Sequence, residues 1–255
     1  MIEGAAALKR FWQLAAALAG LALTLSGLVG CSGSADPPHS ARPEHPAWSS
    51  RKPMGQWRND GFAVLNNEWN TSQAGPQMIW ANSFHYWGVQ SKQPISTSVK
   101  TYPCVQRIYA NPPLASFSKI SSSFDESMPS SPYFDAEAAY DIWLNNYKIE
   151  VMIWVDNKGR QPAQSLVGHA TLEQRKFAVW QSGSAMYSFV LSNGRQTRGK
   201  IDILSFLQWL VHHGYLSASA TMTQIDFGWE IASTDGIPLD FTMKGYSLSS
   251  AMKRH

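Results

Sequence analysis

The sequence predicts an all-β fold, a two-sheet β-sandwich of the jelly-roll type with one packed α-helix. From Gln56 onward, short apolar and aromatic runs alternate with Gly, Pro, Asn and Ser clusters, which is typical of strands joined by turns. A single segment has helical spacing instead. Of the 255 residues, 44% are hydrophobic and 15% charged, with 11 Trp, 9 Tyr and 11 Phe, which is enough for one domain with a large core.

Residues 1–31 have the character of an export signal rather than of a folded segment. The basic pair Lys9-Arg10 precedes an apolar, Ala/Leu-rich run that is too short to cross a bilayer comfortably. The run ends in Leu-Val-Gly-Cys31, which resembles the lipobox of bacterial lipoproteins. This resemblance implies that Cys31 carries lipid, begins the mature chain and anchors an exported protein at the cell surface. The open alternative is an ordinary signal with an unrelated cysteine, which would give a secreted protein.

Residues 32–55 predict a flexible tether, because they are rich in Pro, Ser, Ala and charge and poor in apolar residues. His39 and His45 lie in this stretch, and a solvated linker explains them better than a metal site. Cys104 is expected to be a buried free thiol. A Cys31–Cys104 disulfide is the disfavoured alternative, because it would tie the tether to the domain.

Residues 56–255 are expected to form one domain of many strands and one helix. The segment 201–214 has apolar residues at helical spacing and ends in a glycine that suits a helix stop. His212 and His213 fall in its last turn without a third ligand, so no metal is assigned. The Ser-rich stretch 116–131 is expected to hold a hairpin or a long loop. Expected strands include residues 61–66, 77–82, 138–144, 149–155, 177–181, 186–191, 221–231 and 240–248.

Charge and motif content exclude several classes of function. Lys and Arg number 21 and Asp and Glu 18, a net charge of +3, and no long basic run occurs, so no nucleic-acid partner is indicated. No G-x-S-x-G motif occurs, and the His residues lie outside the strand motifs, which argues against a serine hydrolase. No cofactor is predicted.

Side-chain alternation along residues 147–156 points to a functional carboxylate. Glu150 shares its face with Met152 and Trp154, which a plain solvated face does not need. The opposite face is wholly apolar or aromatic and is expected to be core. The faces are Tyr147, Ile149, Val151, Ile153 and Val155 toward the core, and Lys148, Glu150, Met152, Trp154 and Asp156 on the other side.

Two further strands place a carboxylate in a similar setting. In residues 221–231, Glu230 shares a face with Gly228, which is expected to leave open space beside it. In residues 140–144, Asp141 lies opposite the inward-facing side chains. Glycoside hydrolysis needs paired carboxyl groups, one to attack or stabilise the sugar carbon and one to protonate the leaving oxygen. Their pKa values must be pushed apart by environment.

The ordered set of these motifs resembles glycoside hydrolase family 12, which contains endo-β-1,4-glucanases and xyloglucan hydrolases. The resemblance runs from about Gln56 to about Ser249. It implies a jelly roll with a long open cleft on its concave sheet. It also implies a monomer that hydrolyses β-1,4 bonds in cellulose-like or mixed-linkage glucans by a retaining, endo-acting mechanism. The matching segments are N-N-E-W (66–69), V-K-T-Y-P (99–103), Y-D-I-W-L (140–144), E-V-M-I-W-V (150–155), Y-S-F-V (187–190) and F-G-W-E (227–230).

The family's functional residues carry over by motif. Glu150 matches the nucleophile, Glu230 the general acid/base, and Asp141 the partner of the nucleophile. The two carboxyl groups of a retaining pair are expected to lie about 5–5.5 Å apart. The implied substrate-binding residues are Asn67 and Trp69, which hold a sugar on the non-reducing side, and Met152 in the cleft.

One departure and two alternatives stay open. The family usually has Pro after the acid/base glutamate, whereas here Ile231 follows. Xyloglucan is the alternative substrate, because loops rather than motifs set the width of the cleft. A non-catalytic glucan-binding protein on the same fold is the alternative from another class, although it would be expected to lose one of the paired glutamates.

Overall fold

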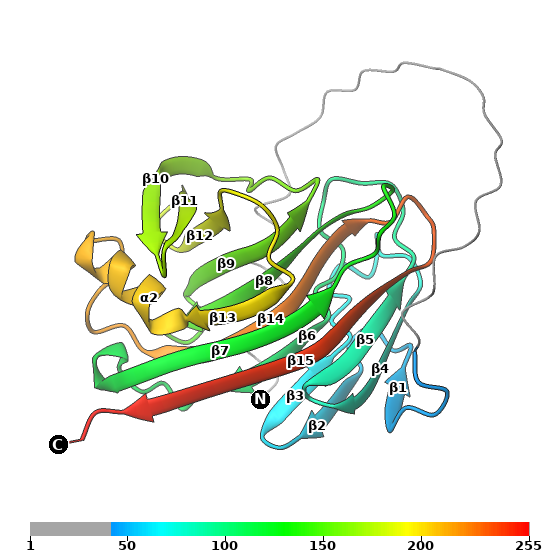
Figure 1. The fold of residues 1–255 in the computed structure, drawn as a ribbon, viewed down its shortest axis with the longest axis horizontal. Helices are drawn as coiled ribbons and strands as arrows, with labels where there is room; N and C mark the ends of the chain where they lie inside the picture. Colours follow the sequence, from blue (N-terminus) through cyan, green and yellow to red (C-terminus); the bar gives the residue numbers. More distant parts are fainter. Residues whose placement is uncertain (1–41, 255) are drawn as a thin grey trace, which may run out of the picture.

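Two sheets pack face to face across one hydrophobic core in the computed structural model, which describes residues 42–254 (Figure 1). The prediction of an all-β, two-sheet jelly-roll sandwich with one packed helix is confirmed. The six-stranded sheet consists, in spatial order, of β1 (Trp48–Ser50), β4 (Gln77–Ser83), β5 (Tyr86–Ser91), β15 (Leu239–Met252), β7 (Phe117–Ser127) and β13 (Arg198–Asp202).

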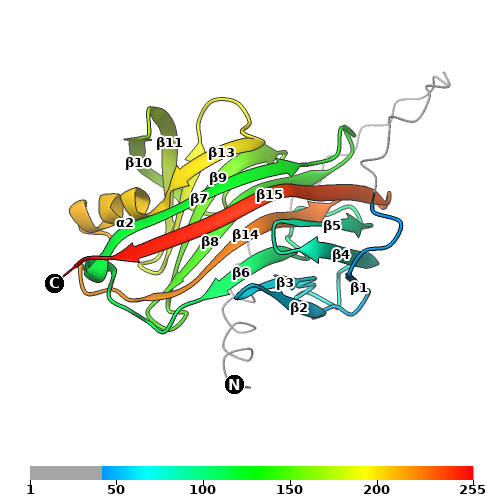
Figure 2. The same ribbon diagram turned by 60° about the horizontal axis from the view of Figure 1, so that its bottom comes forward.

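The larger sheet has nine strands. In spatial order they are β10 (Ser165–Leu172), β11 (Arg175–Ser182), β12 (Met186–Leu191), β9 (Ile149–Lys158), β8 (Asp135–Leu144), β14 (Met222–Ser233), β6 (Cys104–Ile108), β3 (Phe62–Leu65) and β2 (Gln56–Asn59). Neighbouring strands are antiparallel except β12 and β9, which are parallel. The strands β1–β5 gather at one end of the sandwich, and the helix lies at the other (Figures 1 and 2).

Strand β8 illustrates how alternation builds the core. Its even-numbered side chains pack between the two sheets, while the odd-numbered ones point the other way. The face of the nine-stranded sheet that is turned away from the six-stranded sheet is called the site face below. The core side chains of β8 are Ala136, Ala138, Tyr140, Ile142 and Leu144.

The Ser-rich stretch 116–131 contains the single strand β7, so the expectation of a hairpin or long loop was wrong. Every second residue of β7 still points inward, and Ile120 and Phe124 are buried in the core. Ser121 and Ser123 lie on the outer face, where the Ser123 and Ser247 hydroxyls are 2.7 Å apart. Ser122 is buried and accepts a hydrogen bond from the Tyr140 hydroxyl at 2.8 Å. Because serines occupy so many positions of β7, the sequence did not show the alternation of apolar and polar residues that predicts a strand.

The predicted tether also extends too far toward the domain. Strand β1 falls inside residues 32–55, and its Ser49 pairs with Trp80 of β4. The Trp48 ring lies parallel to the Trp57 ring, with centroids 6.4 Å apart. The packed domain therefore begins before Gln56. The predicted signal and Cys31 lie outside the described residues.

The predicted helix is present as α2 (Ile203–His212), shorter than residues 201–214 because β13 takes the first two positions. Phe206 packs edge-on against Phe177 of β11 and Phe189 of β12, with ring centroids 5.0 and 5.1 Å apart. The helix stops where Gly214 adopts a φ of 74°, a left-handed conformation that glycine takes at little cost. No helix within residues 42–254 has the length and apolarity of a membrane span.

Strand β9 contains a bulge that reverses the predicted face of Asp156. Trp154 pairs with Ala139 and Asp156 with Ala138, which leaves Val155 as the extra residue. Asp156 therefore shares the core side with Ala138, where Arg195 Nη2 lies 2.8 Å from its Oδ2. Sequence alternation had assigned it to the face of Glu150, and this was wrong.

Tyr147 was also assigned to the wrong side. It lies in the turn before β9, where residues 145–147 all have positive φ. Its hydroxyl donates to Oε1 of Gln224 at 3.1 Å, and its ring lies 6.1 Å from that of Trp143. Trp143 and Gln224 are on the site face, so Tyr147 caps the end of that face instead of entering the core.

Candidate functional site

Three adjacent strands bring Glu150, Asp141 and Glu230 to the site face. They come from β9, β8 and β14 respectively, and β8 lies between the other two. Glu150 pairs with Trp143 of β8, whereas Glu230 pairs with Glu137 at the other end of the same row. Asp141 lies between these two positions. The prediction that all three carboxyl groups share one face, with Ile149, Val151 and Ile153 behind them, is confirmed.

Asp141 is fixed by its neighbours on both sides. The indole Nε1 of Trp143 donates to its Oδ2 at 2.8 Å. Met152 of β9 is its cross-strand partner on one side and Asp226 of β14 on the other. The next strand after β9 adds Ser188 opposite Met152. These residues form one continuous row of the site face.

Met152 belongs to a small apolar cluster on the site face, separate from the main core. The cluster joins it to Ala139 and Trp154, and Val190 packs against them. The predicted position of Met152 beside the carboxyl groups is therefore confirmed as geometry. Ala139 lies between Glu137 and Asp141 on this face of β8, so only a methyl group separates the two carboxyl groups along the strand.

Beside Glu230 lies the carboxyl group of Glu137, which the sequence analysis missed. Glu137 is fully buried and lies within hydrogen-bonding reach of Glu230. The guanidinium Nε of Arg160 donates to Glu137 Oε2 at 2.8 Å, and its Nη1 donates to the carbonyl of Thr97 at 2.7 Å. The expected strand began at residue 138, whereas β8 begins at Asp135 and includes Glu137. Alternation back from Asp141 would have placed Glu137 on the same face.

Burial raises the pKa values of these carboxyl groups. It raises the pKa of Asp141 and of Glu150 well above the ordinary values, and ionised neighbours raise them further. The pKa of Glu230 is raised as well, by burial first and then by the charges of Glu150 and Asp141, against the lowering effect of Glu137 and Arg160. The three groups therefore interact electrostatically as one site.

Several buried polar atoms on this face have no hydrogen-bond partner among residues 42–254. Such atoms are uncommon in folded proteins, and here they gather around the carboxyl groups. A ligand with many hydroxyl groups could pair with both the donors and the acceptors among them. They are both Glu150 oxygens, Asp141 Oδ1, Asp226 Oδ1, Glu137 Oε1, Ser188 Oγ, and the indole nitrogens of Trp154 and Trp180.

Asn67 is linked to the site face through Tyr102, a buried residue that the sequence analysis did not single out. The Asn67 side-chain amide donates to the Tyr102 carbonyl at 3.0 Å, and the Tyr102 amide donates to the Asn67 carbonyl at 3.0 Å. The Tyr102 hydroxyl donates to the carbonyl of Ala139 at 2.9 Å. Trp69 is half-buried two residues further on. Both predicted binding residues thus lie on a segment that is tied to the centre of the site.

Gly228 does not leave open space beside Glu230, as the sequence analysis expected. A Cβ at this position would lie 2.0 Å from the carbonyl oxygen of Pro103 and 2.7 Å from Cys104 Cα. The glycine therefore permits close approach of β14 to β6. Ile231, which replaces the family's Pro, donates its amide to the Thr101 carbonyl at 3.0 Å, a bond that proline could not make. Cys104 itself is a buried free thiol, as predicted.

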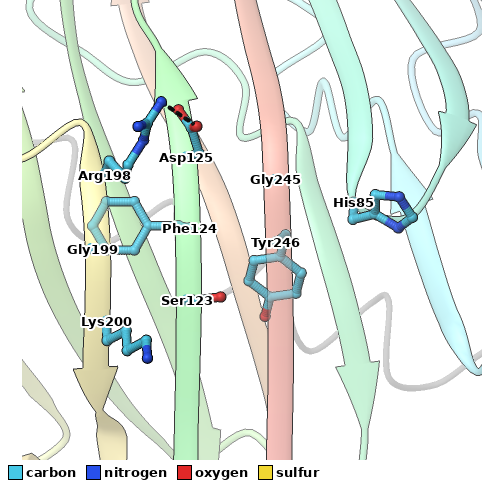
Figure 3. A pocket seen from close by; sticks show the side chains of 9 residues that line it. All are labelled: His85, Ser123, Phe124, Asp125, Arg198, Gly199, Lys200, Gly245 and Tyr246. Carbon is cyan, nitrogen blue, oxygen red and sulfur yellow. Dashed lines mark ion pairs between the residues drawn. The ribbon is translucent and has the colours of Figure 1, made fainter.

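A shallow hollow of about 440 Å³ lies on the opposite sheet (Figure 3). Ser123 and Lys200 line it, and an ion pair of 2.7 Å between Arg198 and Asp125 crosses one side. These side chains point away from the core on β7 and β13. The hollow is therefore separate from the carboxyl groups of the site face.

A jelly-roll sandwich that collects several buried carboxyl groups on one sheet face is an arrangement expected of a glycoside hydrolase. The family model of glycosyl hydrolase family 12 matches residues 60–250. The chain belongs to this family, as the motif resemblance predicted.

Individual relatives agree with this assignment. A xyloglucan-specific endo-beta-1,4-glucanase A from Emericella nidulans is 27% identical over 217 residues, which cover 76% of this chain and 89% of that protein. A probable cellulase Cel12b from Mycobacterium tuberculosis is 30% identical over 123 residues, or 44% of this chain and 74% of that protein. The solved xyloglucanase domain of NopAA from Sinorhizobium fredii, in complex with cellobiose, is 27% identical with a TM-score of 0.70, covering 81% of this chain and all of that one.

Proposed function

We propose that the protein is a retaining, endo-acting hydrolase of β-1,4-glucosidic bonds in cellulose-like or mixed-linkage glucans. The observation that carries this proposal is the placement of Glu150, Asp141 and Glu230 on one face of three adjacent strands, where their charges influence one another. Family membership and the named activities of the relatives support the substrate class.

In the first step, a Glu150 carboxylate oxygen attacks the anomeric carbon and forms a glycosyl ester. The bond between that carbon and the glycosidic oxygen breaks, and the leaving oxygen takes the Glu230 proton. In the second step, Glu230 accepts a proton from water, whose oxygen attacks the same carbon and releases Glu150 as a carboxylate. Two inversions at one carbon give net retention of configuration.

Asp141 would keep Glu150 ready for attack. Burial holds the proton on Asp141, a neighbouring Asp226 adds to this effect when it is ionised, and Asp141 Oδ1 has no other partner among the described residues. A protonated Asp141 can donate a hydrogen bond to the Glu150 carboxylate, which stabilises the ionised form that attack requires. This donation offsets part of the cost of burying the Glu150 charge.

Asn67, Trp69 and Met152 are proposed to contact the sugar chain. An indole ring offers a flat apolar face that suits the C–H face of a sugar, and its N–H can donate to a hydroxyl group. Met152 lies beside Asp141 on the site face, where a sugar at the reaction centre would lie over it. The link from Asn67 through Tyr102 to Ala139 would hold this binding segment in register with the reacting groups.

Xyloglucan is the second candidate substrate, because two of the relatives at 27% identity are named for activity on it. The deciding experiment measures reducing-sugar release from carboxymethylcellulose, mixed-linkage β-glucan and tamarind xyloglucan, with Glu150→Gln as the matched control. Activity of the wild type on one of these, lost in the control, supports the proposal. Binding to glucan without release of sugar would favour the non-catalytic reading and overturn it.

Export is also proposed, with Cys31 as a lipid-bearing N-terminus. The basic pair, the short apolar run and the Leu-Val-Gly-Cys sequence support this reading. A polymer such as a β-glucan is too large to enter a cell intact, so an enzyme of this class is useful outside the cytoplasm.

A further inference from the structure

Glu230, Glu137 and Arg160 lie next to one another in this order. Glu137 and Glu230 are direct cross-strand partners of β8 and β14, so their side chains leave the same face next to each other. Arg160 forms an ion pair with Glu137, with its Nε 2.8 Å from Glu137 Oε2. Its guanidinium is itself held by the Thr97 carbonyl at 2.7 Å, so the cation has a fixed position.

We propose that Glu137, held by Arg160, is a positioning residue that aims the Glu230 carboxyl group and shares one proton with it. This inference rests on the proposed function and adds a residue pair that acts on the acid/base without touching the sugar. Glu137 is fully buried, its Oε2 accepts from Arg160, and its cross-strand neighbour is Glu230, so it is placed to act through Glu230.

The charge balance explains the effect. Two buried carboxyl groups this close cannot both ionise readily, so the pair retains one proton near neutral pH. The positive charge of Arg160 lowers the pKa of both carboxyl groups, while the hydrogen bond between them raises the pKa of Glu137 and lowers that of Glu230. Glu137 Oε1 has no other partner among the described residues and can share the retained proton with Glu230. The proton is therefore held beside the group that must deliver it.

Other charged groups face this pair from neighbouring elements. Their electrostatic effects contribute to the titration of the pair. They are Asp135 on β8, Lys100 and Tyr102 in the segment before β6, Asp235 after β14, and Glu150 and Asp141 on the site face.

Two substitutions should shift the pKa of Glu230 in opposite directions. Glu137→Gln places an amide donor beside Glu230 and leaves Arg160 with the more distant Asp135, at 3.9 Å, as its ion-pair partner, so Glu230 should lose its proton at a pH lower by at least about one unit. Arg160→Gln removes the positive charge, so the proton should be held to higher pH. The alkaline limb of the kcat/KM profile should move in the same two directions, with kcat falling in Glu137→Gln while KM changes little.

The full-length protein carries the test. The readouts are the kcat/KM profile on a soluble glucan and a ¹³C NMR titration of the glutamate carboxyl carbons, with Arg160→Lys expected to stay near the wild type. Asp125→Asn is the matched control, because Asp125 also pairs with an arginine, Arg198, but on the far sheet. An unmoved Glu230 titration in Glu137→Gln, or shifts of the same sign in both variants, would overturn the proposal. The NMR readout needs no turnover, so an inactive wild type would refute the proposed function alone.

Discussion

Asp141 of β8 and Asp226 of β14 are direct cross-strand partners, so two carboxyl groups face each other at the centre of the site. The side-chain amide of Gln224 donates to Asp226 Oδ2 at 2.6 Å. Burial raises the pKa of Asp226 to about 8, against the lowering effect of this hydrogen bond. The pair therefore keeps a proton at pH values where an exposed aspartate has lost its own.

Asp226→Asn should stabilise the protein at alkaline pH. Because the pKa of Asp226 is about 8 in the folded chain and 3.8 normally, folding is unhindered below about pH 4 and is progressively opposed as pH rises to about 8. Asparagine removes that cost, and we expect a gain of about 1–3 kcal/mol in unfolding free energy at pH 8 and little change at pH 4. Urea unfolding at both pH values measures this, with exposed Asp60→Asn as control. A gain that is equal at the two pH values would contradict the explanation.

Glu150→Ala and Glu230→Ala should fail in different ways. Loss of Glu230 removes acid help, so glucans should react about 10²–10⁴-fold more slowly while aryl glycosides with good leaving groups suffer far less. Loss of Glu150 removes the attacking group and should abolish hydrolysis of both substrate types. Steady-state rates on a soluble glucan and on an aryl cellobioside separate the two patterns. Wild-type activity in either variant would show that the residue is not catalytic.

Azide should reveal the same division of roles through product stereochemistry. In Glu150→Ala, azide can attack the anomeric carbon directly and give a product of inverted configuration. In Glu230→Ala, azide should replace water in the second step and give a product of retained configuration. Proton NMR of the glycosyl azides distinguishes the anomers. The reverse pairing of variant and anomer would exchange the roles assigned to the two glutamates.

Gly228→Ala should cost about 1–3 kcal/mol of stability or more, because the added methyl group would meet the Pro103 carbonyl at 2.0 Å. The neighbouring backbone of β6 would have to move, and with it the segment that carries Tyr102. Gly168→Ala on β10 is the matched control, since nothing lies within 4 Å of a Cβ there. Thermal unfolding compares the two, and equal melting temperatures would contradict the account.

Cys31→Ala should release the protein from the membrane if Cys31 is the lipid-bearing residue. We expect the variant in the soluble or secreted fraction and the wild type in the membrane fraction, as measured by immunoblot after fractionation. Ser32→Ala serves as the control for a change at the same site. An unchanged distribution of Cys31→Ala would refute lipidation as the anchor.

Strict alternation along a strand was enough to place the reacting groups but failed wherever the backbone was irregular. Glu150, Asp141 and Glu230 share a face because β8, β9 and β14 are regular around them. Asp156 was misplaced because one extra residue, Val155, shifts the remainder of β9 by one position. No pattern of side-chain types in the sequence announces such a bulge.

The missed residues of the site have a different cause. Arg160 follows β9 in a loop, and its contact with Glu137 depends on how that loop folds back over the sheet. Loop paths are set by tertiary contacts that no local periodicity encodes. Gly228 was recognised as special, but the partner that requires it, Pro103, is more than a hundred residues away in sequence and is identified only by the packing of β6 on β14.

The position of β15 sets the order in which the sandwich can form. This last strand of the chain lies inside the six-stranded sheet, between β5 and β7, rather than at its edge. Before residues 239–252 are available, β1, β4 and β5 have no bridge to β7 and β13. Such long-range pairing is slow because distant segments must meet. The six-stranded sheet would therefore remain incomplete until the C-terminal strand is synthesised.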